Sequence, residues 1–154
     1  AQDIFVRDRD QDGLDDLTGN PVDVLAITDG VVLSTFSDWE KTSISKEIRG
    51  GNYVWIYHPA LLSFSYYAHL AEVFVRQGER VPGGRKIASL GRTGKNASLL
   101  RSPTHLHLMV LSSRRMSPLN PFPLLKSSTI TGCFAVAPTA TGVFPSPAPG
   151  ASAF

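Results

Sequence analysis

Two histidines, His105 and His107, stand two positions apart in an apolar segment of the chain. The alternating residues 105–111 predict a β-strand. Side chains two residues apart point to the same face of a strand, so the two imidazoles are expected on one side, about 6.6 Å apart along it. Neutral imidazole is a preferred zinc ligand and a proton carrier near pH 7. The pair is therefore a candidate for metal binding or proton transfer, with two ligand-free strand histidines as the alternative.

The other two histidines, His58 and His69, each end a predicted strand. Residues 53–57 are β-branched and aromatic, and His58 follows them directly before Pro59. We interpret His58 as structural, with a hydrogen bond at the strand end. His69 ends the strand predicted over residues 64–69, and such a strand end can lie beside the His105–His107 pair. His69 is therefore a further candidate for catalysis, with a capping or surface role as the alternative.

Short strands dominate the elements that must position these histidines. Strands are expected at residues 22–27, 31–33, 53–57, 64–69, 86–90 and 105–111, with a short one at Val81. The turn signal Thr28-Asp29-Gly30 predicts that the first two form a hairpin. A single helical turn is expected near residues 70–74. The pattern predicts an all-β fold: a compact antiparallel sandwich or hybrid barrel of short strands with little helix.

Length and composition limit the remaining possibilities. A chain of 154 residues forms one domain, which we place at residues 1–125; the Pro-, Ala- and Ser-rich residues 126–154 are expected to form a disordered tail. The net charge of +2 gives no reason to expect a nucleic-acid partner. Cys133 is the only cysteine, which excludes a disulfide framework and a cysteine zinc cluster. No run of about 18 apolar residues occurs, so no membrane span is expected. We expect a monomer.

An acidic segment near the start of the chain follows a different pattern. Asp8, Asp10 and Asp12 alternate and are followed by Gly13, which matches the beginning of a calcium-binding loop. The twelfth position of that loop is Gly19 rather than a bidentate glutamate, and flanking helices are not expected. We therefore interpret the segment as a solvated acidic loop, with a calcium site as the alternative.

Taken in order, several of these segments resemble the lysostaphin-type (LytM-like) zinc metallopeptidases. The matching stretches are Asp3-Ile4, Pro21-Val22, Asp29-Gly30-Val31-Val32, Gly51 to His58, Tyr67-Ala68-His69-Leu70, Gly78-Glu79-Arg80-Val81, Gly84-Arg85-Lys86-Ile87, Gly91-Arg92-Thr93-Gly94 and His105-Leu106-His107-Leu108. Each motif is modest alone, and their collinear order over residues 3–111 carries the resemblance. The chain departs from the family pattern in residues 95–103, which form a longer link, and in Thr104.

The resemblance implies a zinc-dependent endopeptidase that cleaves peptide cross-bridges of bacterial peptidoglycan, in the periplasm or outside the cell. It implies Asp3 and His107 as zinc ligands and His105 and His69 as catalytic residues. Catalytic zinc usually has three protein ligands and one water. The family's remaining ligand is a histidine four residues before the aspartate, which corresponds to a position two places before Ala1. We therefore expect the domain to be truncated at its N-terminus and its activity to be impaired in this chain.

Two other classes of function remain as alternatives. A non-catalytic module that binds the cell wall or regulates another hydrolase would have the same fold. A biotinyl or lipoyl carrier shares the Gly78 to Ile87 turns but needs a lysine at a hairpin tip, which this sequence lacks. The aromatic residues Trp55, Tyr66 and Tyr67 are interpreted as core or cross-strand packing, with groove lining as the alternative.

Overall fold

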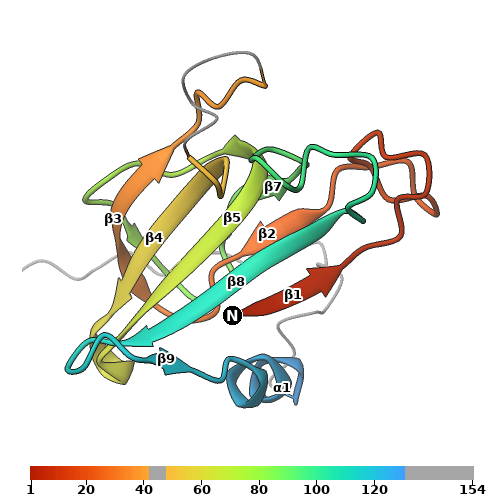
Figure 1. The fold of residues 1–154 in the computed structure, drawn as a ribbon. Coiled ribbons are helices and arrows are strands. Elements are labelled where there is room, and N and C mark those ends of the chain that lie inside the picture. The colour runs from red at the N-terminus through yellow and green to blue at the C-terminus, as the bar shows by residue number, and fades with distance from the viewer. Residues whose placement is uncertain (42–47, 131–154) are drawn as a thin grey trace, which may run out of the picture.

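The computed structural model describes residues 1–41 and 48–130 (Figure 1). The strands are β1 (Gln2–Phe5), β2 (Asp23–Leu25), β3 (Gly30–Phe36), β4 (Asn52–His58), β5 (Ser63–Val73), β6 (Arg80–Val81), β7 (Lys86–Leu90), β8 (His105–Ser112) and β9 (Pro118–Leu119). A 3₁₀ turn, Pro59–Leu61, links β4 to β5, and one α-helix, α1 (Phe122–Ile130), follows β9. The fold is nearly all β, as predicted.

The strands form one antiparallel sheet that folds over on itself. Its main layer has the order β1-β8-β5-β4-β3-β6, and β9 pairs with β8. The long strand β5 pairs with β4 and β8 in its first part, and from Leu70 onward it pairs with β7. β7 in turn pairs with β2, and these two strands lie behind the main layer in Figure 1. The bend of β5 therefore carries the chain from one layer to the other.

The core fills the space between these layers. Alternate residues of the main layer point inward, among them Val54, Ile56 and Val110, and each is completely buried. Ile87 and Leu90 of β7 belong to the same buried cluster. Burial of such apolar side chains stabilises each by about 1.5–3 kcal/mol. The opposite face of the main layer is left free to carry other side chains.

Tyr67 fixes the two layers against each other. Its ring is buried at 1% exposure, and its hydroxyl accepts a hydrogen bond from the backbone N–H of Ile27 at 3.0 Å. Burial raises the pKa of Tyr67 to about 12, so the phenol stays neutral. The prediction that Tyr67 is a core residue is confirmed.

Two local predictions were wrong. Residues 22–33 do not form a hairpin, because β2 pairs with β7 while β3 pairs with β4 and β6. The Thr28-Asp29-Gly30 turn instead meets a distant turn, where the N–H of Gly83 donates to Asp29 Oδ1 at 2.7 Å. The helical turn expected at residues 70–74 is absent from the described structure, because β5 continues to Val73 and is paired there with Ala88.

The C-terminal part of the described chain adds elements that the sequence pattern did not suggest. β9 and α1 were not expected, and α1 runs across the predicted domain boundary between residues 125 and 126. Residues 131–154 of the predicted tail lie outside the described residues. Within the described chain, no helix is long and apolar enough to cross a membrane.

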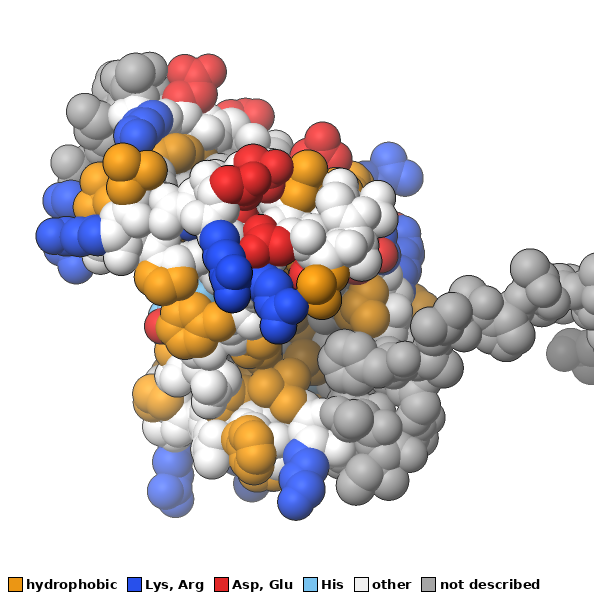
Figure 2. Space-filling model, turned by 90° about the vertical axis from the view of Figure 1, so that its right-hand side faces the viewer, with side chains coloured by type: hydrophobic (Ala, Val, Ile, Leu, Met, Phe, Trp, Pro, Cys, Tyr) orange, Lys and Arg blue, Asp and Glu red, His pale blue; other side chains and the backbone are white. Residues whose placement is uncertain are grey.

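A long loop connects β1 to β2 and wraps one end of the sheet. It is closed by a bridge between Leu14 and Pro21, and the N–H of Val6 donates to the carbonyl of Thr104 at 3.2 Å. The loop lies at the right of Figure 1, and Figure 2 shows acidic side chains gathered on that face. The loop thereby joins the start of the chain to the entry of β8.

Candidate active site

β8 carries His105 and His107 on the outward face of the main layer. Leu106 packs against the core, whereas both histidine rings contact the ring of His69, at centroid distances of 4.9 Å for His105 and 5.9 Å for His107. The prediction that the two rings share one face is confirmed. The period of two along a strand is enough to place them.

β1 brings Asp3 directly opposite His107. The two residues are register partners in the β1–β8 ladder. Asp3 Oδ1 lies 2.8 Å from His107 Nδ1, and both side chains are partly exposed. A carboxylate and an imidazole that meet on an open sheet face are donors suited to a metal ion. This contact joins residues that are 104 positions apart in the sequence.

His69 reaches the same face through an unusual backbone conformation. Tyr67 points into the core, so simple alternation would turn His69 inward as well. Its φ of 66° instead places it in the left-handed region, where a residue other than glycine costs about 1–3 kcal/mol. The surrounding backbone holds this conformation: the N–H of His69 donates to Gly50 O at 2.9 Å, and its carbonyl accepts from Gly91 N at 3.0 Å.

Backbone carbonyls select one tautomer for two of the rings. His69 Nδ1 lies 2.9 Å from Thr93 O, and His105 Nδ1 lies 2.7 Å from Pro103 O. A carbonyl only accepts, so each Nδ1 carries the proton and donates it. Each Nε2 consequently keeps its lone pair. Both rings are thus oriented with a proton-accepting nitrogen away from the backbone.

The electrostatic surroundings of His69 favour the neutral ring. Burial lowers the pKa of His69, the Thr93 carbonyl raises it, and the neighbouring His105 and His107 lower it again. The net effect is a pKa below the usual value for histidine. At pH 7 His69 is therefore unprotonated on Nε2 and able to take up a proton.

An aromatic cluster borders the histidines. Tyr66 packs on Trp55 at a centroid distance of 4.7 Å and on Tyr53 at 5.6 Å, and it meets the ring of His107 edge-on at 6.4 Å. Trp55 and Tyr66 are register partners, so the cross-strand packing that we predicted for them is confirmed. Burial raises the pKa of Tyr66. The contact between Tyr66 and His107 was not predicted. It follows from strand geometry, because Ala68 is the register partner of His107 and Tyr66, two residues before Ala68, lies on the same face.

His58 lies outside the site. It is completely buried, its Nδ1 donates to Asp29 O at 2.9 Å, and its Nε2 accepts from the Ser65 hydroxyl at 2.7 Å. Burial lowers the pKa of His58, which keeps the ring neutral. Its predicted structural role is confirmed, and three of the four histidines remain for chemistry.

Thr93, whose carbonyl accepts the hydrogen bond from His69, packs closely against Gly51. A Cβ atom on Gly51 would lie 2.4 Å from the backbone of Thr93 and Gly94, and the φ of Gly51 is 68°. The Thr93 hydroxyl donates to Leu70 O at 2.8 Å and accepts from the N–H of Asn52 at 2.9 Å. The position of the Thr93 carbonyl therefore depends on a close approach that only glycine permits.

We expect Gly51→Ala to destabilise the domain more than Gly78→Ala, by about 1–3 kcal/mol. Both glycines have positive φ, but a Cβ atom on Gly78 (φ 84°) would meet nothing within 4 Å. The two variants thus share the cost of a left-handed alanine, about 1–2 kcal/mol, and differ in the clash with Thr93. Urea unfolding would measure the difference. Equal unfolding free energies for the two variants would show that the approach to Thr93 carries no strain.

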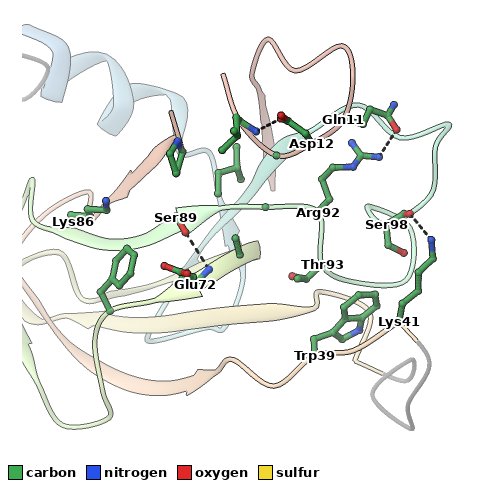
Figure 3. A pocket seen from close by; sticks show the side chains of 17 residues that line it. Gln11, Asp12, Trp39, Lys41, Glu72, Lys86, Ser89, Arg92, Thr93 and Ser98 are labelled. Atoms are coloured by element: carbon green, nitrogen blue, oxygen red, sulfur yellow. Dashed lines mark hydrogen bonds between the residues drawn. The ribbon is translucent and has the colours of Figure 1, made fainter. Parts of the chain in front are cut away.

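A separate cavity of about 510 Å³ lies beside the segment that holds His69 (Figure 3). It is lined by residues 11–14 of the β1–β2 loop, by the ends of β5 and β7, and by Trp39, Arg92 and Thr93. Arg92 points toward Gln11, and its Nη2 donates to Gln11 Oε1 at 2.9 Å. None of the four candidate residues, Asp3, His69, His105 and His107, lines this cavity, so the candidate site is separate from it and lies on the open sheet face.

Comparison with known proteins identifies the family. The model of peptidase family M23 matches residues 9–121, which is most of the chain. The chain belongs to peptidase family M23. The matched segment of this M23 peptidase includes His69, His105 and His107, and Asp3 lies before it. No curated protein sequence matches the chain.

Solved structures agree with this assignment. The catalytic domain of the antimicrobial peptidase lysostaphin from Staphylococcus simulans has a TM-score of 0.54 and 25% identity, with 69% of this chain and 71% of that domain covered. A putative glycyl-glycine endopeptidase, lytM, from Ruminococcus gnavus has a TM-score of 0.55 and 26% identity, covering 70% of this chain and 41% of that one. LytU shares the fold at 24% identity and a TM-score of 0.55, covering 70% of this chain and 66% of LytU. In another structure of the antimicrobial peptidase lysostaphin from Staphylococcus simulans, with a TM-score of 0.53 and 25% identity, the match covers 45% of that chain.

Proposed function

We propose that this M23 peptidase is a zinc-dependent endopeptidase that hydrolyses peptide cross-bridges of bacterial peptidoglycan, in the periplasm or outside the cell. The observation that carries the proposal is the contact between Asp3 and His107, beside two oriented histidines on one open face. The names of its relatives, an antimicrobial peptidase and a putative glycyl-glycine endopeptidase, support a cell-wall peptide as the substrate.

Asp3 and His107 fit a zinc ion. Two donors bound to one tetrahedral zinc lie roughly 3.4 Å apart. Asp3 Oδ1 and His107 Nδ1 are 2.8 Å apart, so the pair would have to open by only about half an ångström. We propose these two as ligands, with the His107 ring carrying its single proton on Nε2 so that the Nδ1 lone pair is free for the metal. A histidine four residues before Asp3 would be the third protein ligand.

The chain's own histidines would move the protons of the reaction. Bound zinc would supply a water of lowered pKa and would polarise the peptide carbonyl. We assign His105 to orient and deprotonate the attacking water, because its Nε2 is free to accept while Pro103 O holds its Nδ1. We assign His69 to stabilise the oxyanion or to protonate the leaving amine. His69 can donate from Nε2 only after taking up a proton, since its Nδ1 proton is held by Thr93 O.

Digestion of purified peptidoglycan would test the proposal. A chain extended by a histidine four residues before Asp3, with zinc in excess, is expected to release fragments with new amino termini at cross-bridge peptide bonds, identified by mass spectrometry, and the 154-residue chain is expected to release fewer. A chelator should abolish this release, and added zinc should restore it. Cleavage that persists in the chelator would contradict zinc dependence. Binding to peptidoglycan without cleavage, even by a chain preceded by the third ligand, would favour a non-catalytic module.

A further inference from the structure

Three carboxylates converge in the loop between β1 and β2, away from the histidines. Asp8, Asp10 and Asp16 each offer one oxygen, and these oxygens all lie within 4.8 Å of one another. Asp10 and Asp16 are exposed, whereas Asp8 is 7% exposed. The face that carries the loop is the one on which acidic side chains gather in Figure 2. Acidic groups that meet in this way repel one another unless something neutralises them.

The buried carboxylate lacks a partner for one of its oxygens. Asp8 Oδ2 accepts from the Thr104 hydroxyl at 2.7 Å and from the N–H of Gly13 at 3.0 Å. Asp8 Oδ1 is shielded from solvent and has no hydrogen-bond partner. A buried carboxylate oxygen without a partner is costly, and native proteins rarely leave one in that state. The unpaired oxygen therefore points to a ligand that is bound by this side chain.

The described part of the chain supplies no cation for this cluster. Among residues 1–41 and 48–130, no lysine, arginine or histidine lies within ion-pair distance of Asp8, Asp10 or Asp16. Arg92 is close, but it donates to Thr104, Gln11 and the carbonyl of Leu99. Burial raises the pKa of Asp8, but hydrogen bonds from Thr104 and Gly13 outweigh it, so the pKa is below its ordinary value and the group is ionised.

We propose that this cluster is a binding site for a divalent cation, Ca²⁺, held by the carboxylates of Asp8, Asp10 and Asp16. An all-oxygen set of hard ligands suits Ca²⁺ and disfavours Zn²⁺. The three residues occupy positions one, three and nine of the calcium-loop pattern, and Gly13 stands at position six with a φ of 89°. The proposal therefore favours the calcium site, which the sequence analysis kept as the alternative to a solvated acidic loop.

The ligand set indicates modest affinity. The carboxylate of Asp12 is engaged by the N–H of Leu14 at 2.8 Å, and Gly19 replaces the bidentate glutamate of the twelfth position. Water molecules would complete the coordination. A site with these ligands is expected to bind calcium with a Kd on the order of 10⁻⁴ to 10⁻³ M, as extracellular modules do.

The bound ion would hold the β1–β2 loop against the residue that precedes β8. Asp8 binds the hydroxyl of Thr104, the residue before His105, and Val6 binds the carbonyl of the same Thr104. The loop also supplies Gln11 and Asp12 to the wall of the cavity in Figure 3. An ion that binds the folded loop and not the unfolded chain stabilises the fold. This effect is independent of the proposed zinc chemistry.

Thermal unfolding and calorimetry of the zinc-free chain would test the site. CaCl₂ at about 10 mM is expected to raise the Tm by roughly 4–10 °C and to give a saturable heat of binding. Asp10→Asn and Asp16→Asn should weaken calcium binding at least tenfold, and because both side chains are exposed these variants should fold. Asp15→Asn is the matched control from the same loop, since the Asp15 carboxylate caps Leu17 and Thr18 within its own turn.

His107→Ala separates this site from the sheet face, and it should keep the full response to calcium. The proposal is overturned if the folded parent chain shows neither binding heat nor a change in Tm. It is equally overturned if Asp16→Asn and Asp15→Asn respond alike, or if the response disappears in His107→Ala. In that last case the ion would belong to the pair formed by Asp3 and His107.

Discussion

His105→Ala and His69→Ala, in a chain extended by a histidine four residues before Asp3, are each expected to lower kcat/KM for a cross-bridge peptide by about 10²–10⁴-fold while the zinc content stays unchanged. Neither ring is proposed as a ligand. Each is held through its Nδ1 by a backbone carbonyl, and its removal leaves the contact between Asp3 and His107 in place. The loss should therefore fall on proton transfer and not on the metal. Zinc content measured by elemental analysis, beside peptide hydrolysis, separates the two effects.

The matched control is the histidine outside the site. His58→Gln removes a completely buried imidazole that does not touch the site rings. Its hydrogen-bond partner is the carbonyl of Asp29. The substitution is expected to lower stability, because it replaces two well-formed hydrogen bonds, and to leave kcat/KM nearly unchanged while the chain is folded. Activity within a few-fold of the parent in His105→Ala or His69→Ala would refute the catalytic assignment. Loss of zinc in either variant would make that residue a ligand.

The parts of the site that could be predicted from sequence are those set by local periodicity. His105 and His107 share a face because side chains alternate along any strand, and residues 86–90 and 105–111 lie within the observed β7 and β8. His69 is the opposite case. Alternation would turn its ring toward the core, and only a φ of 66° brings the ring to His105. That conformation is imposed by Gly50 and Gly91, which lie in other segments, so no local pattern reveals it.

Long-range pairing explains the errors in the fold. The Thr28-Asp29-Gly30 turn has the composition of a hairpin, and what decides against a hairpin is its contact with Gly83, 54 residues later. β1 has only four residues, too few for a convincing strand signal, yet its register with β8 sets Asp3 against His107. The family resemblance named Asp3 as a ligand candidate, but its place in the sheet depends on a partner at the other end of the domain.

A histidine placed four residues before Asp3 is expected to raise zinc affinity by more than about 100-fold over the 154-residue chain. Two donors, Asp3 and His107, are fewer than the three protein ligands of most catalytic zinc sites, and each added ligand contributes strongly to binding. A straight continuation of β1 would carry the new histidine about 13 Å from Asp3. The added segment must therefore bend back toward His107 for the new histidine to reach the metal. Because a straight extension of β1 could not do this, an increase in zinc affinity would test the proposed three-ligand site.

The control is the same extension with alanine in place of the new histidine, which should bind zinc no better than the 154-residue chain. In the histidine-extended chain, His107→Ala and Asp3→Asn should each return the affinity to that low level, because each removes one of the three donors. Competition with a chromogenic chelator would give the zinc affinity of each of these chains. Equal zinc binding by the histidine and alanine extensions would exclude the proposed third ligand. Unchanged binding in His107→Ala would place the metal elsewhere, and since the Asp8 cluster offers only oxygen ligands, Asp16→Asn would then show whether zinc had moved there.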